Sequence, residues 1–129
     1  MCGFIGGISK TPILSNNFNN ANRHIICRGP DKNLYLNNSN NINSLNFEKY
    51  FHFEFNRLSI LDLADEADQP MFSNESTNLI MFNGEIYNHA ELRKELESEG
   101  LKFKTSHSDT EVILKGLSTY GPKFIEKLM

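Results

Sequence analysis

The second residue of the chain, Cys2, is the residue whose type and position most directly suggest chemistry. Removal of the initiator methionine would leave a free α-amine and a thiol on this one residue. An α-amine is a base of suitable strength to accept a thiol proton near neutral pH. Cys2 is therefore a candidate nucleophile activated by its own terminal amine. The alternative is an incidental small residue near a frayed chain end.

Asn83 and Gly84 form the second candidate, because they directly follow the apolar run 79–82. An Asn-Gly pair is a strong turn signal, since both residues tolerate positive φ. A turn at this place can aim the Asn83 amide and a backbone N–H at one point, as an oxyanion hole does. A plain hairpin turn is the alternative interpretation.

Arg57 is the third candidate, because it lies between an aromatic run and an apolar run and is expected to be partly buried. A buried guanidinium needs an anionic partner, and its fork of donors matches a carboxylate. Arg57 can thus bind a substrate carboxylate. The alternative is an ion pair within the chain, for which the nearby acids are Asp62, Asp65 and Glu66.

Glu85 and Asp109 form the fourth candidate, since both lie near the ends of predicted elements and could bind an ammonium group. They could equally be a turn residue and an acid that the helix dipole stabilises. The four histidines and two cysteines lack the spacing of metal ligands, so no metal site is predicted. No glycine-rich loop of the common phosphate-binding kinds occurs either.

The composition sets limits on the class of protein. The chain has 129 residues, a formal net charge of −3, 39% hydrophobic residues and 22% charged residues, which is typical of one small globular domain. It has no basic stripe and no apolar run of about 20 residues, so neither nucleic acid nor a membrane is expected as a partner. Two cysteines and the lack of a signal peptide favour a cytoplasmic location.

Hydrophobic spacing predicts the elements that must position the candidate residues. Strands are expected over 3–8, near 34–36, near 45, over 51–55 with an extension into 57–61, and over 79–82. A helix is expected over 17–27. Asn88 with Glu91, and Ser108 with Glu111, have the spacing of capping boxes and predict two more helices, ended by Gly100 and by 121–122. A last helical turn is expected over 123–129. This mixed order predicts an α+β fold.

Six stretches taken together resemble a known family. They are MCGFIGG at 1–7, RGPD at 28–31, NRLSILDL at 56–63, QP at 69–70, NGEIYN at 83–88 and SDTEVIL at 108–114. Their order and spacing are similar to the class II glutamine amidotransferase domain of glutamine-hydrolysing asparagine synthetases. Amidotransferases that make glucosamine phosphate or phosphoribosylamine share the Cys-Gly start but lack the RLSILDL and SDTEVIL motifs.

The resemblance implies a role for each candidate residue. Cys2 would attack the side-chain amide of glutamine and form a γ-glutamyl thioester, while its α-amine carries the proton to departing ammonia. Asn83 and Gly84 would hold the oxyanion. The substrate-binding residues would be Arg57 for the α-carboxylate, Glu85 and Asp109 for the α-ammonium, and the backbone of Leu58, Ser59, Ile60 and Leu61 as the pocket lining.

The resemblance also implies a fold and partners. The expected fold is the four-layer αββα sandwich of N-terminal nucleophile hydrolases, with residues 2–129 as an incomplete domain whose C-terminal strands are missing. The synthetase domain, which would use ATP and Mg²⁺ to amidate aspartate, is expected to be absent. No cofactor is expected in this chain. The implied partners are L-glutamine and a synthetase domain, and assembly as a homodimer stays open.

Two other functions remain open from the sequence. The chain could be an inactive truncated remnant or interaction module that keeps the motifs without a working site. It could also be an amidotransferase half that delivers ammonia to an acceptor other than aspartate.

Overall fold

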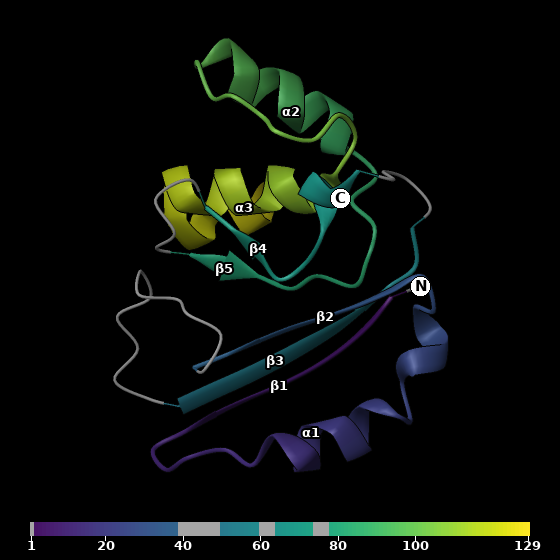
Figure 1. The fold of residues 1–129 in the computed structure, drawn as a ribbon. Helices are drawn as coiled ribbons and strands as arrows, with labels where there is room; N and C mark the ends of the chain where they lie inside the picture. Colours follow the sequence, from purple (N-terminus) through teal and green to yellow (C-terminus); the bar gives the residue numbers. More distant parts are fainter. Residues whose placement is uncertain (1, 39–49, 60–63, 74–77) are drawn as a thin grey trace. The chain divides into compact units, whose positions relative to one another are not determined.

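The computed structural model describes residues 2–38, 50–59, 64–73 and 78–129 (Figure 1). The chain divides into two compact units, Met1–Ser59 and Ile60–Met129. Both units combine strands with helices, so the fold is of the α+β class. The strand expected near residue 45, and the part of the 57–61 extension that contains Ile60 and Leu61, lie outside the described residues.

The first unit is built on a three-stranded antiparallel sheet of β1 (Gly3–Ser9), β2 (Lys32–Asn37) and β3 (Tyr50–Arg57). The order is β1-β3-β2, so β3 is the central strand. These bounds confirm the strands expected over 3–8, 34–36 and 51–55. The pairing places Gly3 opposite Asn56 and Lys32 opposite Arg57, which brings the beginnings of β1 and β2 to the end of β3.

The two faces of this sheet differ in polarity because β3 alternates aromatic and polar residues. Phe51, Phe53 and Phe55 lie on one face. On the other face the buried side chains of His52 and Glu54 form a pair at 2.7 Å. This alternation is the period-2 pattern expected from the sequence.

The helix α1 (Ser15–Asn22) lies along one face of the sheet, as Figure 1 shows. Its contacts with His52 and Asn56 identify this as the polar face. The Phe18 ring stacks on the His52 ring at 4.5 Å between centroids. The Asn56 amide, fully buried, donates to Asn22 Oδ1 at 2.5 Å and accepts from Asn33 Nδ2 at 2.9 Å. A hydrogen-bonded polar network, rather than an apolar seam, therefore joins α1 to the sheet.

The helix expected over 17–27 ends earlier than predicted. After Asn22 the N–H groups of His24 and Ile25 bond three residues back, to Ala21 and Asn22, and the short 3₁₀ helix η1 (Ile26–Arg28) follows. The helix thus ends where the Asn-rich segment ends, and residues 23–28 continue in 3₁₀-type turns rather than in α-helix.

The second unit holds η2 (Asp65–Ala67), β4 (Met71–Phe72), β5 (Leu79–Ile80), α2 (His89–Ser98), α3 (Asp109–Tyr120) and the 3₁₀ helix η3 (Gly121–Lys127). β4 and β5 pair antiparallel, and α2 packs on α3 (Figure 1). The shared core consists of Ile86, Leu92, Leu96, Val112, Ile113 and Phe124. The last helical turn expected from the sequence is present as η3.

The strand expected over 79–82 is only two residues long. β4 offers two residues for pairing, so Met81 and Phe82 have no strand partner there. The Phe82 N–H instead donates to the side chain of Gln69 at 2.6 Å. A side chain thus replaces the strand partner at this position.

One of the two expected caps is confirmed. Ser108 Oγ accepts the Glu111 N–H at 3.3 Å at the start of α3, as a capping serine does. The cap expected from Asn88 is wrong, because its side chain bonds elsewhere: Nδ2 donates to the Lys127 carbonyl at 2.8 Å and Oδ1 accepts the Met129 N–H at 3.1 Å. Gly100, at φ 92°, ends α2 as expected.

Gly29 allows the closest backbone approach in the first unit. A Cβ atom at this position would lie 2.1 Å from the Asn56 carbonyl oxygen and 2.7 Å from the Arg57 carbonyl carbon. Both neighbours are backbone atoms of the central strand, so they cannot move aside cheaply. Only glycine therefore lets residues 28–31 lie against the end of β3.

We predict that Gly29→Ala lowers the free energy of unfolding by about 3 kcal/mol or more, because the new methyl group overlaps the β3 backbone. Gly100→Ala is the matched control. Its Cβ would meet nothing within 4 Å, so it carries only the cost of a positive φ, about 1 kcal/mol. Urea unfolding of both variants measures the difference. Equal losses would contradict the close approach at Gly29.

Candidate active site

The candidate nucleophile lies beside the residue that follows the central strand. Cys2 Sγ accepts the Leu58 N–H at 3.3 Å, and the thiol donates to the Leu58 carbonyl at 3.7 Å. The pairing of Gly3 with Asn56 produces this contact, because it aligns the residue before β1 with the chain that leaves β3. Cys2 is half-buried, so its sulfur is held without being sealed from solvent.

The 28–31 motif holds both sides of this contact. Arg28 Nε donates to the Cys2 carbonyl at 3.1 Å. Asp31 holds the end of β3. Its N–H donates to the Arg57 carbonyl at 3.1 Å, and its Oδ2 accepts the Ser59 N–H at 2.7 Å. Asp31 was not identified as a site residue from the sequence. The only available signal was its place in the motif that carries the resemblance.

Arg57 is the last residue of β3, and its side chain is 6% exposed. Burial was expected from its position between an aromatic and an apolar run. The structure thus brings Cys2, Arg57, Leu58 and Ser59 together in the first unit. Ile60 and Leu61, also expected at the site, lie outside the described residues.

The remaining candidate residues belong to the second unit. Asn83, Gly84 and Glu85 follow β5 and are exposed. The plain hairpin alternative is wrong, because the chain continues into α2 rather than into a pairing strand. Gly84 does not adopt the positive φ that its turn propensity allows. A Cβ at Gly84 would approach the tip of the Phe82 ring to 2.6 Å, so a larger residue here would shift that side chain.

Asp109 connects the start of α3 to this turn. Its Oδ2 accepts the Ile86 N–H at 3.2 Å, and its Oδ1 accepts the Thr110 hydroxyl at 3.3 Å. The side chain also sits in the first turn of α3, where the helix dipole favours a negative charge. A carboxylate has about four lone-pair positions, so Asp109 keeps capacity for a further donor.

A second carboxylate of α3, Glu111, holds the loop that precedes the helix. It accepts the Lys104 N–H at 2.9 Å, and the Thr105 N–H and hydroxyl at 2.8 and 2.7 Å. Arg93 supports the same loop by donating to the Thr105 carbonyl at 2.8 Å. The sequence suggested Glu111 only as a capping-box partner. In the structure its carboxylate accepts hydrogen bonds from this loop instead.

The electrostatics of Glu111 follow from these contacts. Burial raises the pKa of its carboxyl, but the hydrogen bonds from Thr105 and Lys104 and the charge of Lys115 lower it, and the net pKa lies below the ordinary value of 4.5. Lys115 Nζ lies 3.4 Å from Glu111 Oε1. Glu111 is therefore a charged anchor at neutral pH.

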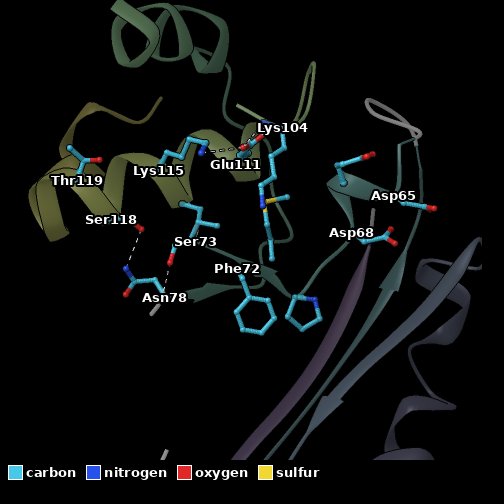
Figure 2. A pocket seen from close by; sticks show the side chains of 14 residues that line it. Asp65, Asp68, Phe72, Ser73, Asn78, Lys104, Glu111, Lys115, Ser118 and Thr119 are labelled. Atoms are coloured by element: carbon cyan, nitrogen blue, oxygen red, sulfur yellow. Dashed lines mark hydrogen bonds and ion pairs between the residues drawn. The ribbon is translucent and has the colours of Figure 1, made fainter. Parts of the chain in front are cut away.

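A separate pocket of about 580 Å³ lies between α3 and the segments around β4 and β5 (Figure 2). Its lining combines the acids Asp65, Glu66, Asp68 and Glu111, the lysines Lys104 and Lys115, and apolar residues such as Met71 and Leu114. Figure 2 shows Asn78 bonded to Ser118 at its edge, at 3.1 Å. None of the described residues predicted from the sequence to form the glutamine site lines this pocket.

Among the described residues, no group of three or more His, Cys, Asp or Glu side chains is arranged to hold a metal ion. In the same part of the chain, no helix is long and apolar enough to cross a membrane.

Comparison with known proteins decides the family. A model of the glutamine amidotransferase domain matches residues 1–129. The chain belongs to the glutamine amidotransferase domain family. The resemblance stated from the six motifs is thereby confirmed.

Asparagine synthetases are among the curated relatives of this amidotransferase chain. It is 38% identical over 133 residues to the glutamine-hydrolyzing asparagine synthetase 1 of Bacillus subtilis, covering 99% of the chain and 19% of the relative. It is 39% identical over 107 residues to the corresponding enzyme 1 of Arabidopsis thaliana, covering 82% of the chain and 16% of the relative. The chain thus spans less than a fifth of the length of these relatives, in their N-terminal region.

We predict that Glu111→Gln lowers the free energy of unfolding by roughly 2 kcal/mol at pH 7, since hydrogen bonds to a charged group are lost. The folded pKa of Glu111 is lowered, so its contribution is present above the unfolded pKa and disappears as pH falls through the folded value. The difference in the free energy of unfolding between wild type and Glu111→Gln should therefore shrink as the pH falls. Denaturant unfolding from pH 3 to 7 measures it.

The control is Glu97→Gln, which removes an exposed carboxylate 3.9 Å from Arg93. Exposed pairs contribute about 0–1 kcal/mol, so this variant should change little at any pH. A Glu111→Gln deficit that stays constant down to pH 3 would contradict the charged anchor.

Proposed function

We propose that this chain hydrolyses the side-chain amide of L-glutamine, with Cys2 as nucleophile, as the glutaminase part of an asparagine synthetase. The observation that carries the proposal is the fixed contact between Cys2 Sγ and the Leu58 N–H, directly beside the buried Arg57. In this proposal the Arg57 guanidinium faces the thiol, an arrangement suited to a substrate that carries both an electrophilic carbonyl and a carboxylate. Family membership supports the same activity.

The proposed reaction begins after removal of Met1. The Cys2 amine takes the thiol proton as Sγ bonds to the side-chain carbonyl carbon of glutamine. The amine returns that proton to the substrate nitrogen as the C–N bond breaks, which releases ammonia and leaves a γ-glutamyl thioester. Water then adds to the thioester, the C–S bond breaks, and glutamate leaves with the thiol restored.

The other candidate residues bind the substrate in this scheme. The Asn83 amide and the Gly84 N–H stabilise the oxyanion, and Arg57 binds the α-carboxylate. Glu85 and Asp109 bind the α-ammonium, and the backbone of residues 58–61 lines the pocket. Glutamine is then selected over its analogues, because a substrate lacking either charge loses one of these charged contacts.

The proposal extends to the larger protein that the relatives suggest. Residues 2–129 form part of an αββα sandwich that further strands complete. The released ammonia serves the ATP-dependent amidation of aspartate in a synthetase domain outside this chain, and the enzyme works in the cytoplasm. The small share of each relative that the chain covers supports this division.

The test is intact mass before and after incubation with a diazoketone analogue of glutamine, which alkylates a thiol with loss of N₂. We expect a processed chain without Met1 and one adduct, blocked by excess glutamine. Cys2→Ala should give no adduct. Cys27→Ala is the matched control, because Cys27 is an exposed free thiol whose removal should leave the labelling intact.

Two outcomes would contradict the proposal. A processed chain that takes no label would mean that these residues do not form a glutamine site, which favours the inactive remnant. An adduct that persists in Cys2→Ala and disappears in Cys27→Ala would mean that the reagent only finds the exposed thiol.

We further predict that Asn83→Ala lowers kcat for glutamine hydrolysis by roughly 10²- to 10³-fold with a smaller change in KM, since one oxyanion donor is lost. Steady-state ammonia release measures both constants. Alkylation of Cys2 by iodoacetamide serves as the control, because it needs the thiol but not the oxyanion site. A fall confined to KM would assign Asn83 to ground-state binding instead.

A further inference from the structure

Gln69 joins the two segments that supply the second unit's candidate residues. Its Oε1 accepts the Phe82 N–H at 2.6 Å, and its Nε2 donates to Thr110 Oγ1 at 3.1 Å. Phe82 directly precedes Asn83, and Thr110 directly follows Asp109. We propose that Gln69 is a positioning residue that sets the oxyanion turn against the ammonium-binding Asp109. This inference rests on the proposed glutaminase function.

The direction of the hydrogen bonds explains why an amide is needed at this position. Thr110 gives its own hydroxyl proton to Asp109 Oδ1, so Thr110 Oγ1 must accept a proton from another group. Gln69 Nε2 is that donor, while Gln69 Oε1 accepts from the Phe82 backbone. An amide supplies a donor and an acceptor on one side chain, whereas a carboxylate only accepts.

Burial makes this arrangement demanding. Gln69 is 8% exposed, and Thr110 is 4% exposed. A buried N–H or hydroxyl that loses its partner cannot turn to bulk water, and leaving such a group unsatisfied costs more than the average hydrogen bond contributes. Phe82 itself is half-buried, so without Gln69 its N–H can turn to water, and the turn after it is then no longer held in one position.

The turn is held at both ends by this system. Gln69 fixes Phe82 before the turn, and Asp109 fixes Ile86 after it, with an N–H to Oδ2 distance of 3.2 Å. Residues 83–85 lie between these two anchors, and both anchors lead to the first turn of α3. The position of the oxyanion donors relative to Asp109 therefore depends on Gln69. Small misplacements of such groups cost large factors in rate.

The test compares three variants of the full chain in glutamine hydrolysis. Gln69→Leu keeps the approximate size but removes both hydrogen bonds, and Gln69→Glu keeps the shape but loses the donor when ionised. Asn78→Leu is the matched control, because Asn78 is an exposed amide that also donates to a hydroxyl of α3, Ser118 Oγ at 3.1 Å (Figure 2).

We expect Gln69→Leu to lower kcat by roughly tenfold to a hundredfold, less than the full loss of an oxyanion donor, with KM changed by less. Asn78→Leu should stay within about twofold of wild type. Gln69→Leu with wild-type kcat and KM would overturn the inference while leaving the proposed function intact.

A pH profile separates positioning from general damage to the fold. The protonated carboxyl of Gln69→Glu has an O–H donor and a carbonyl acceptor, as the amide has. Its activity relative to wild type should therefore rise as pH falls, whereas the ratio for Gln69→Leu should stay flat. A flat ratio for Gln69→Glu, at either high or low activity, would overturn the donor argument.

Amide hydrogen exchange at Phe82 distinguishes a failure of the Gln69 inference from a failure of the proposed glutaminase function. Loss of protection there in Gln69→Leu, but not in Asn78→Leu, is expected from the hydrogen bond. If wild type hydrolyses no glutamine, the proposed function fails and the positioning role fails with it, whatever the exchange shows. If wild type is active and Phe82 exchange is unchanged in Gln69→Leu, the Gln69 inference alone is wrong.

Discussion

The antiparallel pairing of β1 with β3 is the interaction on which the first unit depends. Terminal residues are normally frayed, because few contacts hold them. Here the strand begins at Gly3, and its pairing with Asn56 carries Cys2 to Leu58. The backbone hydrogen bonds of this pairing thereby restrict the conformational freedom of the chain start next to the nucleophile. The motif at 28–31 then adds a second hold on the same two segments.

Side chains that bond to backbone groups are the common device of both units. Asp31, Gln69, Asp109 and Glu111 each accept one or more backbone N–H groups from a loop next to a candidate site residue. These loops have little regular structure, so their N–H groups need partners of this kind. Acid and amide side chains therefore take the place that strand pairing has elsewhere in the chain.

The sequence correctly predicted the elements with strong periodicity, and the roles of the candidate residues stay predictions. The alternation of Phe51, Phe53 and Phe55 correctly indicated a half-buried strand, and Ser108 correctly indicated a helix start. It did not predict the supporting residues, because their roles depend on partners far away in the chain. From the sequence, Gln69 was part of a loop and of the QP stretch of the resemblance, without a role of its own, and its partners Phe82 and Thr110 are 13 and 41 residues distant. Asn88 had the right spacing for a cap, yet the end of the chain offered its side chain other partners.

The polar face of β3 has a consequence for the nucleophile. β1 is rich in glycine, so its own side chains say little about how it should align with its neighbour. The alignment is set instead by β3, where the His52–Glu54 pair and the Asn56 network must face α1 while the phenylalanines face away. If β3 slipped by one residue, these polar groups would face away from α1. The thiol would then lie about 3.3 Å further along the strand direction relative to β3. The side chains of His52, Glu54 and Asn56 thus help to set the strand register, and through the register they set the position of the Cys2 sulfur.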